Sequence, residues 1–301
     1  MDKLITIITP TYNRDANLSS LYQSLLNQTS NNFEWLIVDD GSTDNTYNVV
    51  STYVAENKIQ IDYLKKENGG KHTALNLGIK TINTPLTFIV DSDDQLTDDA
   101  IEVISLYYEK YKEKYLCGFS FLRKYHDGTV NGNLFDPDER IDTYINCRVN
   151  GNDMNSDKAE VYFTSCLKEF PFPEFEGERF LGEDVVWARM SRKYKMVHIN
   201  KPIYISEYLE TGLTRNRRKN NIKSPNGCMT RANEYLSNDV NLKFREKCSL
   251  QYLIYGWFAK KKTKELLKSA NQKWLVILNL APAKLVYLKW KKEFEEKNYN
   301  G

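Results

Sequence analysis

Four short polar segments in the first hundred residues carry side chains that can bind ions, phosphates or hydroxyl groups. The segments are Thr9-Pro10-Thr11-Tyr12-Asn13-Arg14, Asp39-Asp40-Gly41-Ser42-Thr43-Asp44, Asn68-Gly69-Gly70-Lys71-His72 and Asp91-Ser92-Asp93-Asp94. The last segment is the richest in carboxylates, whose oxygens are the ligands that hard divalent cations take in phosphate-binding sites. A lone acidic cluster also has a structural interpretation, because aspartates form turns and place negative charge at the start of helices.

The two middle segments have the same double interpretation. A carboxylate at Asp39 or Asp40 can accept hydrogen bonds from a ribose or a base edge, although Asp-Gly-Ser alone is mostly a turn signal. Lys71 and His72 stand at the expected start of a helix, where free backbone N–H groups favour anions such as a diphosphate. A helix start with a solvated lysine would show the same sequence. Neither Gly-x-x-x-x-Gly-Lys-Ser/Thr nor Gly-x-Gly-x-x-Gly occurs in the chain.

Alternating strand and helix patterns position these segments. The predicted strands cover residues 4–9, 35–38, 59–64 and 86–90, and the predicted helices cover 18–25, 44–56, 71–80 and 98–111, with Asn17 and Thr97 as N-caps. Continuous apolar strands that alternate with helices imply a parallel sheet covered on both faces. Ligands of such sheets bind beyond the carboxyl ends of the strands. Three of the polar segments follow a predicted strand directly, so we expect them to converge at one edge.

The pattern changes after about residue 116 to shorter strands and irregular polar stretches. The sequence predicts a hairpin turn at Asp127-Gly128, a loop-rich stretch over 136–157, a helix that begins at Glu183 or Asp184, short strands over 196–199 and 203–206, a polar and basic stretch over 211–226, and a helical C-terminal region. His126 and His198 lack any partner pattern and are expected to be ordinary surface or core residues.

Composition excludes several classes of protein. The chain has 301 residues, of which 41% are hydrophobic and 27% charged, as in an ordinary globular protein of about two domains. A net charge of +2 argues against a nucleic-acid partner. Five scattered cysteines without a Cys-x-x-Cys pair argue against a zinc ribbon or a disulfide framework. The sequence shows no secretory signal and no apolar run of the ~20 residues that a transmembrane helix needs, so a cytoplasmic location is expected.

The order of the four polar segments resembles the nucleotide-sugar-binding half of family 2 glycosyltransferases, and the resemblance is close over residues 4 to 100. It implies an α/β protein of the GT-A type, with a Rossmann-like, mostly parallel central sheet flanked by helices and a helical C-terminal extension. The expected domains are a nucleotide-sugar-binding half at 1–115, an acceptor-binding half at 116–225 and the helical extension at 226–301.

The resemblance also implies roles for single residues. The expected donor-nucleotide ligands are Pro10, Tyr12, Arg14, Asp39, Asp40, Asn68, Lys71, His72, Asp91 and Ser92. The Asp-x-Asp element of the family holds a divalent ion, so Asp93 and Asp94 are the expected ligands of Mn²⁺ or Mg²⁺. Spacing does not settle which of Asp91, Asp93 and Asp94 contacts the ion. A bound cation would offset the charge that develops on the leaving diphosphate.

Phe180-Leu181-Gly182-Glu183-Asp184 resembles the Glu-Asp element of the family, whose carboxylate serves as the base. An inverting transfer needs one carboxylate to accept the proton of the attacking hydroxyl, and Asp184 is the expected base with Glu183 as its neighbour. The structural alternative is that both carboxylates cap the helix that follows. Three arginines further on, Arg215, Arg217 and Arg218, would either add positive charge at the site or lie in a solvated loop.

The activity implied is metal-dependent, inverting transfer of one sugar, above all from a UDP-sugar, to a carbohydrate or lipid-linked acceptor in cell-surface polysaccharide biosynthesis. Absence of the Gln-x-x-Arg-Trp element of processive members favours a single transfer over polymerisation. One alternative is a sugar-nucleotide nucleotidyltransferase, although residues 10–14 offer no glycine- and basic-rich loop for a triphosphate. The other is a non-catalytic nucleotide- or sugar-binding module of the same fold, against which Asp93 and Asp184 argue weakly.

Lysines and aromatic residues gather toward the C-terminal end. They are Lys260, Lys261, Lys262, Lys264, the run Trp274 to Leu280, and Tyr287, Leu288 and Trp290. A basic amphipathic stretch of this kind can lie on an anionic membrane surface, which would place the protein at the inner face of the membrane. Helices that pack on the catalytic domain would show the same pattern, and both interpretations stay open. No heptad pattern marks an oligomer interface.

Overall fold

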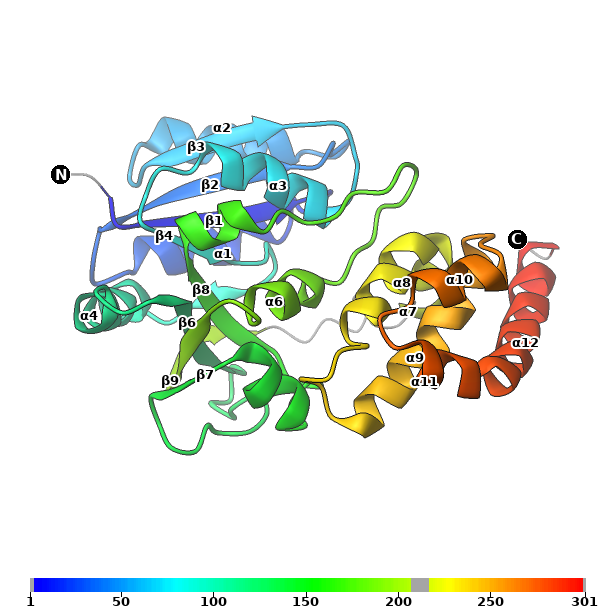
Figure 1. The fold of residues 1–301 in the computed structure, drawn as a ribbon. Helices are drawn as coiled ribbons and strands as arrows, with labels where there is room; N and C mark the ends of the chain where they lie inside the picture. The colour runs from blue at the N-terminus through cyan, green and yellow to red at the C-terminus, as the bar shows by residue number, and fades with distance from the viewer. Residues whose placement is uncertain (1–2, 207–216, 300–301) are drawn as a thin grey trace. The chain divides into compact units, whose positions relative to one another are not determined.

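The computed structural model describes residues 3–206 and 217–299, which fall into two compact units (Figure 1). The first unit comprises Met1–Phe172 and Met190–Leu209, and the second comprises Pro173–Arg189 and Glu210–Gly301. Residues 173–189, which the sequence analysis groups with 116–225, therefore belong to the same unit as the C-terminal helices. The chain thus enters the second unit twice.

The described part of the first unit is built on a nine-stranded sheet. Its strands are β1 (Ile5–Thr11), β2 (Phe33–Asp39), β3 (Ile61–Lys65), β4 (Leu86–Ile89), β5 (Gln95–Leu96), β6 (Leu116–Lys124), β7 (Arg140–Asp142), β8 (Lys158–Phe163) and β9 (Lys195–Ile205). They lie in the order β3-β2-β1-β4-β8-β6-β9-β5, and β7 pairs with β9. Strands β3, β2, β1 and β4 are mutually parallel, β6 and β9 are parallel, and the remaining pairs are antiparallel.

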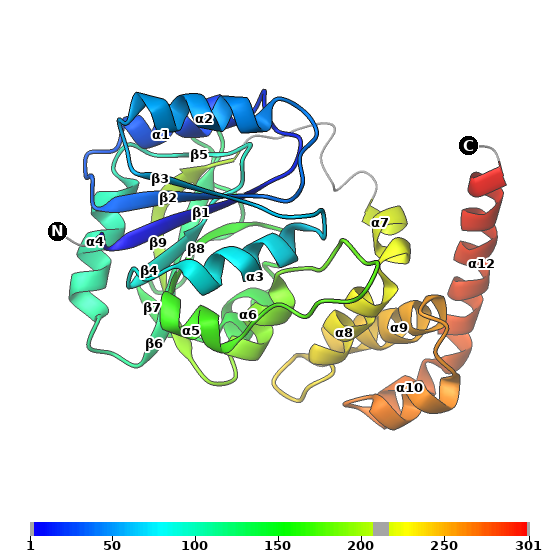
Figure 2. The ribbon, with the colours of Figure 1, turned by 90° about the horizontal axis from the view of Figure 1, so that it is seen from above.

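Burial on both faces explains why β1, β2 and β4 consist mostly of apolar residues and threonines. Every residue of β1 and β4 is buried, as are all but one of β2. Ile7 of β1 pairs in register with Trp35 of β2 and packs in the core that α1 (Leu18–Leu26), α2 (Thr46–Glu56) and α4 (Ala100–Tyr111) cover. Ile8 and Leu36, the next residue on each strand, lie against Gly78 of α3 (Lys71–Thr81). Figure 2 shows α1 and α2 on one side of these strands and α3 on the other. The predicted strand and helix alternation is confirmed.

Several local predictions need correction. The strands expected over 196–199 and 203–206 are one strand, β9, because register shifts in its pairing with β6 accommodate the Pro202 region without ending the strand. The N-cap of α4 is Asp99 and not Thr97, whose hydroxyl instead donates to the Asp99 carboxylate at 2.7 Å. The stretch 136–157 holds β7 and a short π-helix, Ile145–Asn150, besides its loops. The turn at Asp127-Gly128 is confirmed, since the Gly128 N–H donates to the Tyr125 carbonyl at 2.9 Å.

The second unit is helical, as predicted for the C-terminal region. The remaining helices of the chain are α5 (Thr164–Glu169), which belongs to the first unit, then α6 (Asp184–Met190), α7 (Arg217–Lys223), α8 (Pro225–Glu234), α9 (Leu242–Phe258), α10 (Thr263–Ser269), α11 (Lys273–Leu278) and α12 (Leu280–Tyr299). Within the second unit α9 lies between α8 and α12 (Figures 1 and 2). Aromatic rings join α9 to α12, with the Trp257 and Tyr287 ring centroids 5.5 Å apart.

Two further predictions concern the cysteines and membrane-spanning helices. All five cysteines are buried and none forms a disulfide. Among the residues that the structure describes, no helix has the length and apolar character needed to cross a membrane.

Candidate active site

The turns that follow β1, β2 and β4 meet at the carboxyl edge of the parallel strands, as the sequence predicts. The Asn13 N–H donates to the Ser42 hydroxyl at 2.9 Å, and the Thr43 N–H donates to the Asn13 side-chain oxygen at 2.9 Å. Arg14 reaches the turn after β4, where its guanidinium lies 3.9 Å from the Asp93 carboxylate. Three segments separated by up to about eighty residues in sequence therefore form one continuous polar surface.

Asp40 holds the fourth segment against this surface. Its Oδ1 accepts hydrogen bonds from the Gly69 N–H and the Lys66 ammonium, each at 2.9 Å, and its Oδ2 accepts from the Gly70 N–H at 2.6 Å. Asp40 is 3% exposed, so these protein donors take the place of water around its charge. The carboxylate thereby fixes the start of α3, at which Lys71 stands.

Asp39 and Gly41 shape the turn after β2. The buried Asp39 carboxylate accepts from the Ser42 N–H at 2.7 Å and from the Tyr63 hydroxyl. Burial and this contact raise the pKa of Tyr63, so the phenol keeps the proton that it shares with Asp39. Gly41 has φ +84°, and a Cβ there would lie 2.8 Å from the Asn68 nitrogen. Glycine is therefore required by the backbone conformation and by the close approach of the two turns.

Lys71 and Asp91 form an ion pair at this edge, with Nζ 2.5 Å from Oδ1. Burial alone would raise the pKa of the Asp91 carboxyl, but attraction to Lys71, Arg123 and Arg14 outweighs burial and lowers it. Asp91 is therefore an ionised carboxylate in a cationic environment. Cations and carboxylates lie side by side here, which is the composition expected where a polyanion and a metal ion bind together.

Asp94 is held inward by the second half of the sheet. Its Oδ2 accepts from the Tyr204 hydroxyl at 2.7 Å and lies 3.5 Å from a guanidinium nitrogen of Arg123, which itself stacks 3.9 Å above the Tyr204 ring. The same hydroxyl accepts from the Asp91 N–H at 3.1 Å. Asp94 is 7% exposed, so its carboxylate anchors the turn after β4 to β6 and β9.

The Asp93 side chain is 25% exposed and the Asp91 side chain 33%, whereas Asp94 is buried, and the Asp93 carboxylate lies 3.9 Å from the Arg14 guanidinium on the shared polar surface. The described residues contain no group of three or more His, Cys, Asp or Glu side chains able to hold a metal ion. Divalent cations that act on nucleotides often take only one or two carboxylates and complete their shell with phosphate oxygens and water. The donor set of hard oxygens at Asp93, with Asp91 two residues away, fits that mode of binding.

The predicted donor ligands divide into two groups by exposure. Tyr12, Arg14, Asn68, Lys71 and Asp91 are exposed or half-buried, whereas Pro10, Asp39, Asp40, His72 and Ser92 are buried. Pro10 lies within β1 and His72 on the buried side of α3. The first group can touch a ligand directly, and the second supports the turns on which the first stands.

In the second unit, Asp184 begins α6 and its carboxylate is clamped by α8. The Arg231 Nε donates to Oδ1 and Oδ2 at 2.7 and 2.8 Å, and a terminal nitrogen donates to Oδ2 at 2.5 Å. The Tyr235 hydroxyl donates to Oδ2 at 3.0 Å. A Cβ at Gly182 would lie 2.6 Å from Asp184 Oδ1, so glycine leaves the space that this carboxylate occupies. Three of the four bonds go to Oδ2, which leaves Oδ1 with capacity for another donor.

The segment before Asp184 is anchored to the same helix. Glu178 Oε1 accepts from the Asn226 N–H and side-chain amide at 2.8 and 2.7 Å, and Oε2 accepts from the Gly227 N–H at 2.8 Å. The Phe180 N–H donates to the Ser224 hydroxyl at 3.1 Å. The start of α8 therefore holds the chain at several points before the Asp184 carboxylate, and this explains why residues 173–189 form one unit with the C-terminal helices.

Sequence analysis missed Arg231 and Tyr235. Arg231 lies on α8 and Tyr235 is the C-cap of that helix, but no spacing connects them with a carboxylate 47 and 51 residues earlier. Glu183 is half-buried, and its carbonyl accepts from the Val186 N–H at the start of α6. Helix capping, the structural alternative for Asp184, accounts for its position in the first turn but not for its contacts with α8.

The arginines after β9 divide between described and undescribed positions. Arg215 and the side chain of Arg217 lie outside the described residues. Arg218 packs on α12, with its guanidinium 4.8 Å from the Trp290 ring centroid and 3.3 Å from the Glu293 carboxylate.

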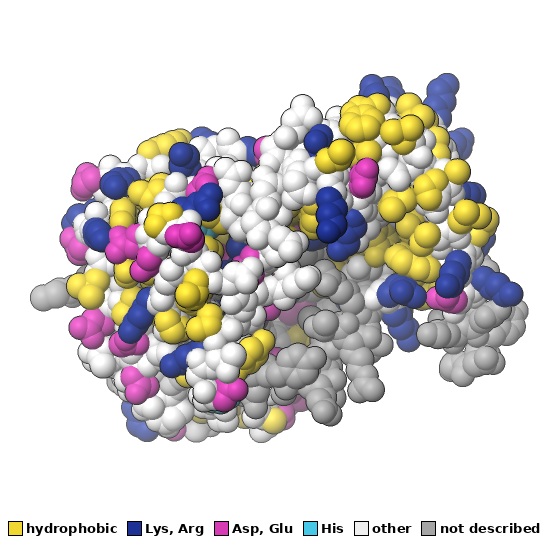
Figure 3. All heavy atoms as spheres, turned by 90° about the horizontal axis from the view of Figure 1, so that it is seen from below, with side chains coloured by type: hydrophobic (Ala, Val, Ile, Leu, Met, Phe, Trp, Pro, Cys, Tyr) yellow, Lys and Arg dark blue, Asp and Glu magenta, His cyan; other side chains and the backbone are white. Residues whose placement is uncertain are grey.

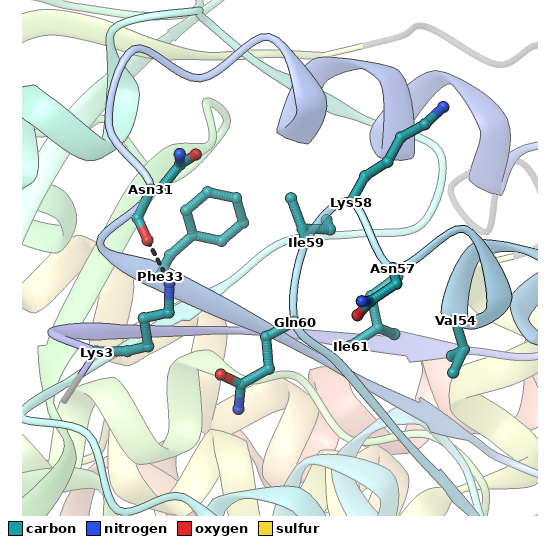
Figure 4. Close-up of a pocket in the computed structure, with 9 residues that line it drawn as sticks. All are labelled: Lys3, Asn31, Phe33, Val54, Asn57, Lys58, Ile59, Gln60 and Ile61. Carbon is teal, nitrogen blue, oxygen red and sulfur yellow. Dashed lines mark hydrogen bonds between the residues drawn. The ribbon is translucent and has the colours of Figure 1, made fainter. Parts of the chain in front are cut away.

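A pocket of about 490 Å³ lies at the other edge of the sheet (Figure 4). Its lining includes Phe33 and Ile61, the first residues of β2 and β3, together with Val54 of α2. None of the predicted site residues lines it, because they follow the carboxyl ends of the strands and the pocket lies at the amino ends.

Comparison with known proteins identifies the family. Residues 6–159, about half of the chain, match the family model described as Glycosyl transferase family 2. The chain belongs to this family. Over 222 residues, glycosyltransferase GlyG of Streptococcus pneumoniae is 31% identical to the present chain. The matched region covers 68% of the chain and 71% of GlyG. An uncharacterized glycosyltransferase of Rickettsia felis is 34% identical over 146 residues, but the match spans only 23% of that longer protein.

Solved structures of other proteins share the fold of the present chain. A structure of residues 1–349 of S. aureus TarS in complex with UDP-GlcNAc superposes with a TM-score of 0.64 at 19% identity, covering 94% of the chain and 80% of the TarS fragment. Mannosyltransferase PcManGT from Pyrobaculum calidifontis, in complex with GDP-Man and Mn²⁺, gives a TM-score of 0.57 at 16% identity, covering 99% and 85%. The expected α/β fold of the GT-A type with C-terminal helices is confirmed.

Proposed function

We propose that this protein is an inverting glycosyltransferase that transfers one sugar from a UDP-sugar to a carbohydrate or lipid-linked acceptor in cell-surface polysaccharide biosynthesis. One observation carries the proposal: the carboxyl edge of β1, β2 and β4 brings Arg14 and Lys71 together with Asp91 and Asp93. Two cations beside ionised carboxylates suit a nucleoside diphosphate and its divalent ion. UDP as the nucleotide is supported by the UDP-GlcNAc complex of TarS.

The exposed residues of this edge divide the work of donor binding. Lys71 begins the eleven-residue helix α3, and its ammonium lies at the positive end of the helix dipole, where phosphate oxygens are favoured. Arg14 adds a guanidinium suited to phosphate recognition, and the 46% exposed ring of Tyr12 offers an aromatic face to a base. Asp40 and Asp39 act indirectly, by holding the turns from which these side chains project.

Asp93 is the proposed ligand of Mn²⁺ or Mg²⁺, and Asp94 positions the turn that carries it. When bound, the cation would neutralise charge on the leaving diphosphate. The Mn²⁺ complex of PcManGT supports a metal ion in this fold. Asp94 is the weaker candidate for direct contact because Tyr204 and Arg123 already occupy its carboxylate.

Asp184 is the proposed base. The acceptor hydroxyl donates its proton to the Asp184 carboxylate while the hydroxyl oxygen attacks the anomeric carbon, and the bond from that carbon to the diphosphate oxygen breaks on the opposite face. Arg231 and Tyr235 hold the carboxylate in position by hydrogen bonds. Oδ1, which carries the fewer of these bonds, is the oxygen available for the proton.

Nucleotide binding tests the proposal without knowledge of the acceptor. Calorimetric titration with UDP, GDP, CDP and dTDP, each with Mn²⁺ and then with chelator, should show metal-dependent binding of UDP. Asp93→Asn should weaken that binding at least about tenfold, because a neutral amide oxygen is a poorer ligand than a carboxylate. The control is Asp98→Asn, an exposed carboxylate a few residues along the same segment, which should bind UDP like the wild type.

The possible outcomes separate the parts of the proposal. Binding of UDP that is insensitive to chelator and to Asp93→Asn would refute the metal site but keep the nucleotide site. Absence of binding by all four nucleotides would refute the donor site as a whole and favour a non-catalytic module.

A further inference from the structure

The short helix α11 and the first half of α12 expose a stripe of large apolar side chains. Over the described residues thirteen large hydrophobic side chains are exposed, and five of them fall within fifteen consecutive residues. The five are Trp274 (53% exposed), Ile277 (53%), Leu278 (69%), Leu285 (71%) and Leu288 (51%). Single exposed leucines are ordinary on soluble proteins, but a cluster of this density marks an interaction surface. We name these five residues the apolar stripe.

Helical spacing places each part of the apolar stripe on one side of its helix. Trp274, Ile277 and Leu278 follow the i, i+3, i+4 pattern in α11, and Leu285 and Leu288 are three residues apart in α12. The other side of each helix is already used within the second unit. Leu275 and Val276 of α11 are buried. On α12 Ala283 is fully buried, and Tyr287 and Trp290 contact aromatic rings of α9. The stripe is therefore the side that the helices do not use in folding.

The charge around the stripe has one sign. Residues 260–292 contain ten lysines and a single acidic residue, Glu265, although the whole chain has a net charge of only +2. The lysines are Lys260, Lys261, Lys262, Lys264, Lys268, Lys273, Lys284, Lys289, Lys291 and Lys292, and all ten are exposed. Figure 3 shows yellow apolar and dark blue basic side chains gathered together over the C-terminal helices.

We propose that the apolar stripe and the surrounding lysines bind the surface of an anionic lipid bilayer, with α11 and the first half of α12 lying in the plane of the interface. Charge complementarity indicates an anionic bilayer as the binding partner, because lysines flank the apolar side chains and anionic headgroups attract basic residues. Tryptophan and leucine would enter the boundary between headgroups and acyl chains while the lysines remain at headgroup level. The inference concerns attachment to a membrane and is independent of which sugar the protein transfers.

Flotation with lipid vesicles tests the inference. Wild-type protein should float with vesicles of phosphatidylglycerol and phosphatidylcholine at low salt, bind less at high salt, and stay unbound with phosphatidylcholine alone. Leu285→Ser/Leu288→Ser should lower the partition coefficient at least about tenfold, since it removes two inserting side chains. The matched control, Leu106→Ser/Leu134→Ser, changes two leucines of the first unit that are 64% and 63% exposed and should bind like the wild type.

A charge variant tests the second half of the inference. Lys273→Gln/Lys289→Gln should lower binding to the anionic vesicles by about fivefold for each lysine, the effect of ~1 kcal/mol per basic residue near such a surface. Thermal unfolding of each variant shows that it is folded, and only folded variants are compared.

Three outcomes would overturn the inference. The first is wild-type protein that does not float with anionic vesicles at low salt. The second is a Leu285→Ser/Leu288→Ser variant that floats as well as the wild type. The third combines two results: the wild-type protein does not bind vesicles, and light scattering without lipid shows a wild-type oligomer that this variant does not form. That combination would assign the apolar stripe to an interface between copies of the chain.

Discussion

The contact between Asp184 and Arg231 makes a quantitative prediction about the second unit. Their side chains are only 15% and 18% exposed, and the shared hydrogen bonds are 2.5 to 2.8 Å long. At 2.8 Å and an effective dielectric constant of about 20, the gross attraction between the charges is about 6 kcal/mol. Part of it offsets the loss of hydration on burial. Removal of one partner from a buried pair typically costs 3–5 kcal/mol, and the residual exposure here reduces our expectation to about 3 kcal/mol.

The perturbation is Arg231→Met, which keeps much of the side-chain volume but removes the guanidinium. Urea denaturation should show a free energy of unfolding lowered by about 3 kcal/mol, because the Asp184 carboxylate loses its main donors. Asp184→Asn removes the charge from the other side. In the double variant neither charge is buried unpaired, so its loss of stability should be smaller than the sum of the two single losses by about 2 kcal/mol.

Turnover gives a second test that a purely structural contact would not pass. If Arg231 positions the base, Arg231→Met should lower kcat about a hundredfold while leaving the affinity for UDP unchanged. Arg231→Lys keeps the charge but not the fork of donors, and should recover part of the loss. Once Asp184 is Asn, Arg231→Met should have little further effect on kcat. Losses in stability and kcat that simply add in the double variant, or wild-type turnover in Arg231→Met, would refute the reasoning.

Two predictions concern the first unit. Burial lowers the pKa of His198 to about 4 from its usual 6.5, so the folded protein binds its proton less readily than the unfolded chain. Protonation of His198 in the unfolded chain therefore lowers the free energy of unfolding as the pH falls from 6.5 toward 4. At pH 5 this free energy is about 2 kcal/mol lower than above pH 6.5. His198→Leu should remove this part of the pH dependence. If the free energies of unfolding of the variant and the wild type differ by the same amount at pH 7 and at pH 5, the prediction is wrong. Gly41→Ala should lower the free energy of unfolding by at least about 2 kcal/mol, because it combines a positive φ with a Cβ 2.8 Å from the Asn68 nitrogen. Gly128 has a similar φ but lies in open space, so Gly128→Ala should lower it by only about 1 kcal/mol. Urea denaturation compares the two alanine variants, and equal losses would show that the close approach of the turns contributes nothing.

The sequence predicts the first hundred residues well for a physical reason. Strands β1, β2 and β4 are covered on both faces, so apolar and β-branched residues predominate in them and the pattern is visible without knowledge of the fold. The parallel connection then dictates that segments after these strands share an edge. For this reason the sequence alone predicts that Arg14, Asp40 and Asp91 lie at the same edge of the sheet.

The contacts of Asp184 and Asp94 could not be predicted in the same way. Arg231 and Tyr204 lie 47 and 110 residues from the carboxylates that they bind, on elements whose own patterns report only their cores. The sequence predicts two strands where β9 is one, and a register shift in the pairing of β9 with β6 accommodates Pro202 within the strand. In each case a tertiary contact decides the outcome, and local spacing carries no information about that contact.

The three aspartates after β4 show how much the surroundings add to a motif. In sequence Asp91, Asp93 and Asp94 are equivalent carboxylates at the end of one strand. In the structure Asp91 pairs with Lys71, Asp94 is bound by the Tyr204 hydroxyl, and Asp93 remains partly exposed beside Arg14. The oxygens of Asp91 and Asp94 that bind Lys71 and Tyr204 would have to exchange those close partners for a cation, whereas the ion pair of Asp93 with Arg14 is longer, at 3.9 Å. The proposed metal-binding role therefore suits Asp93 best, because side chains of α3 and β9 engage its two neighbours, and the motif itself does not specify those contacts.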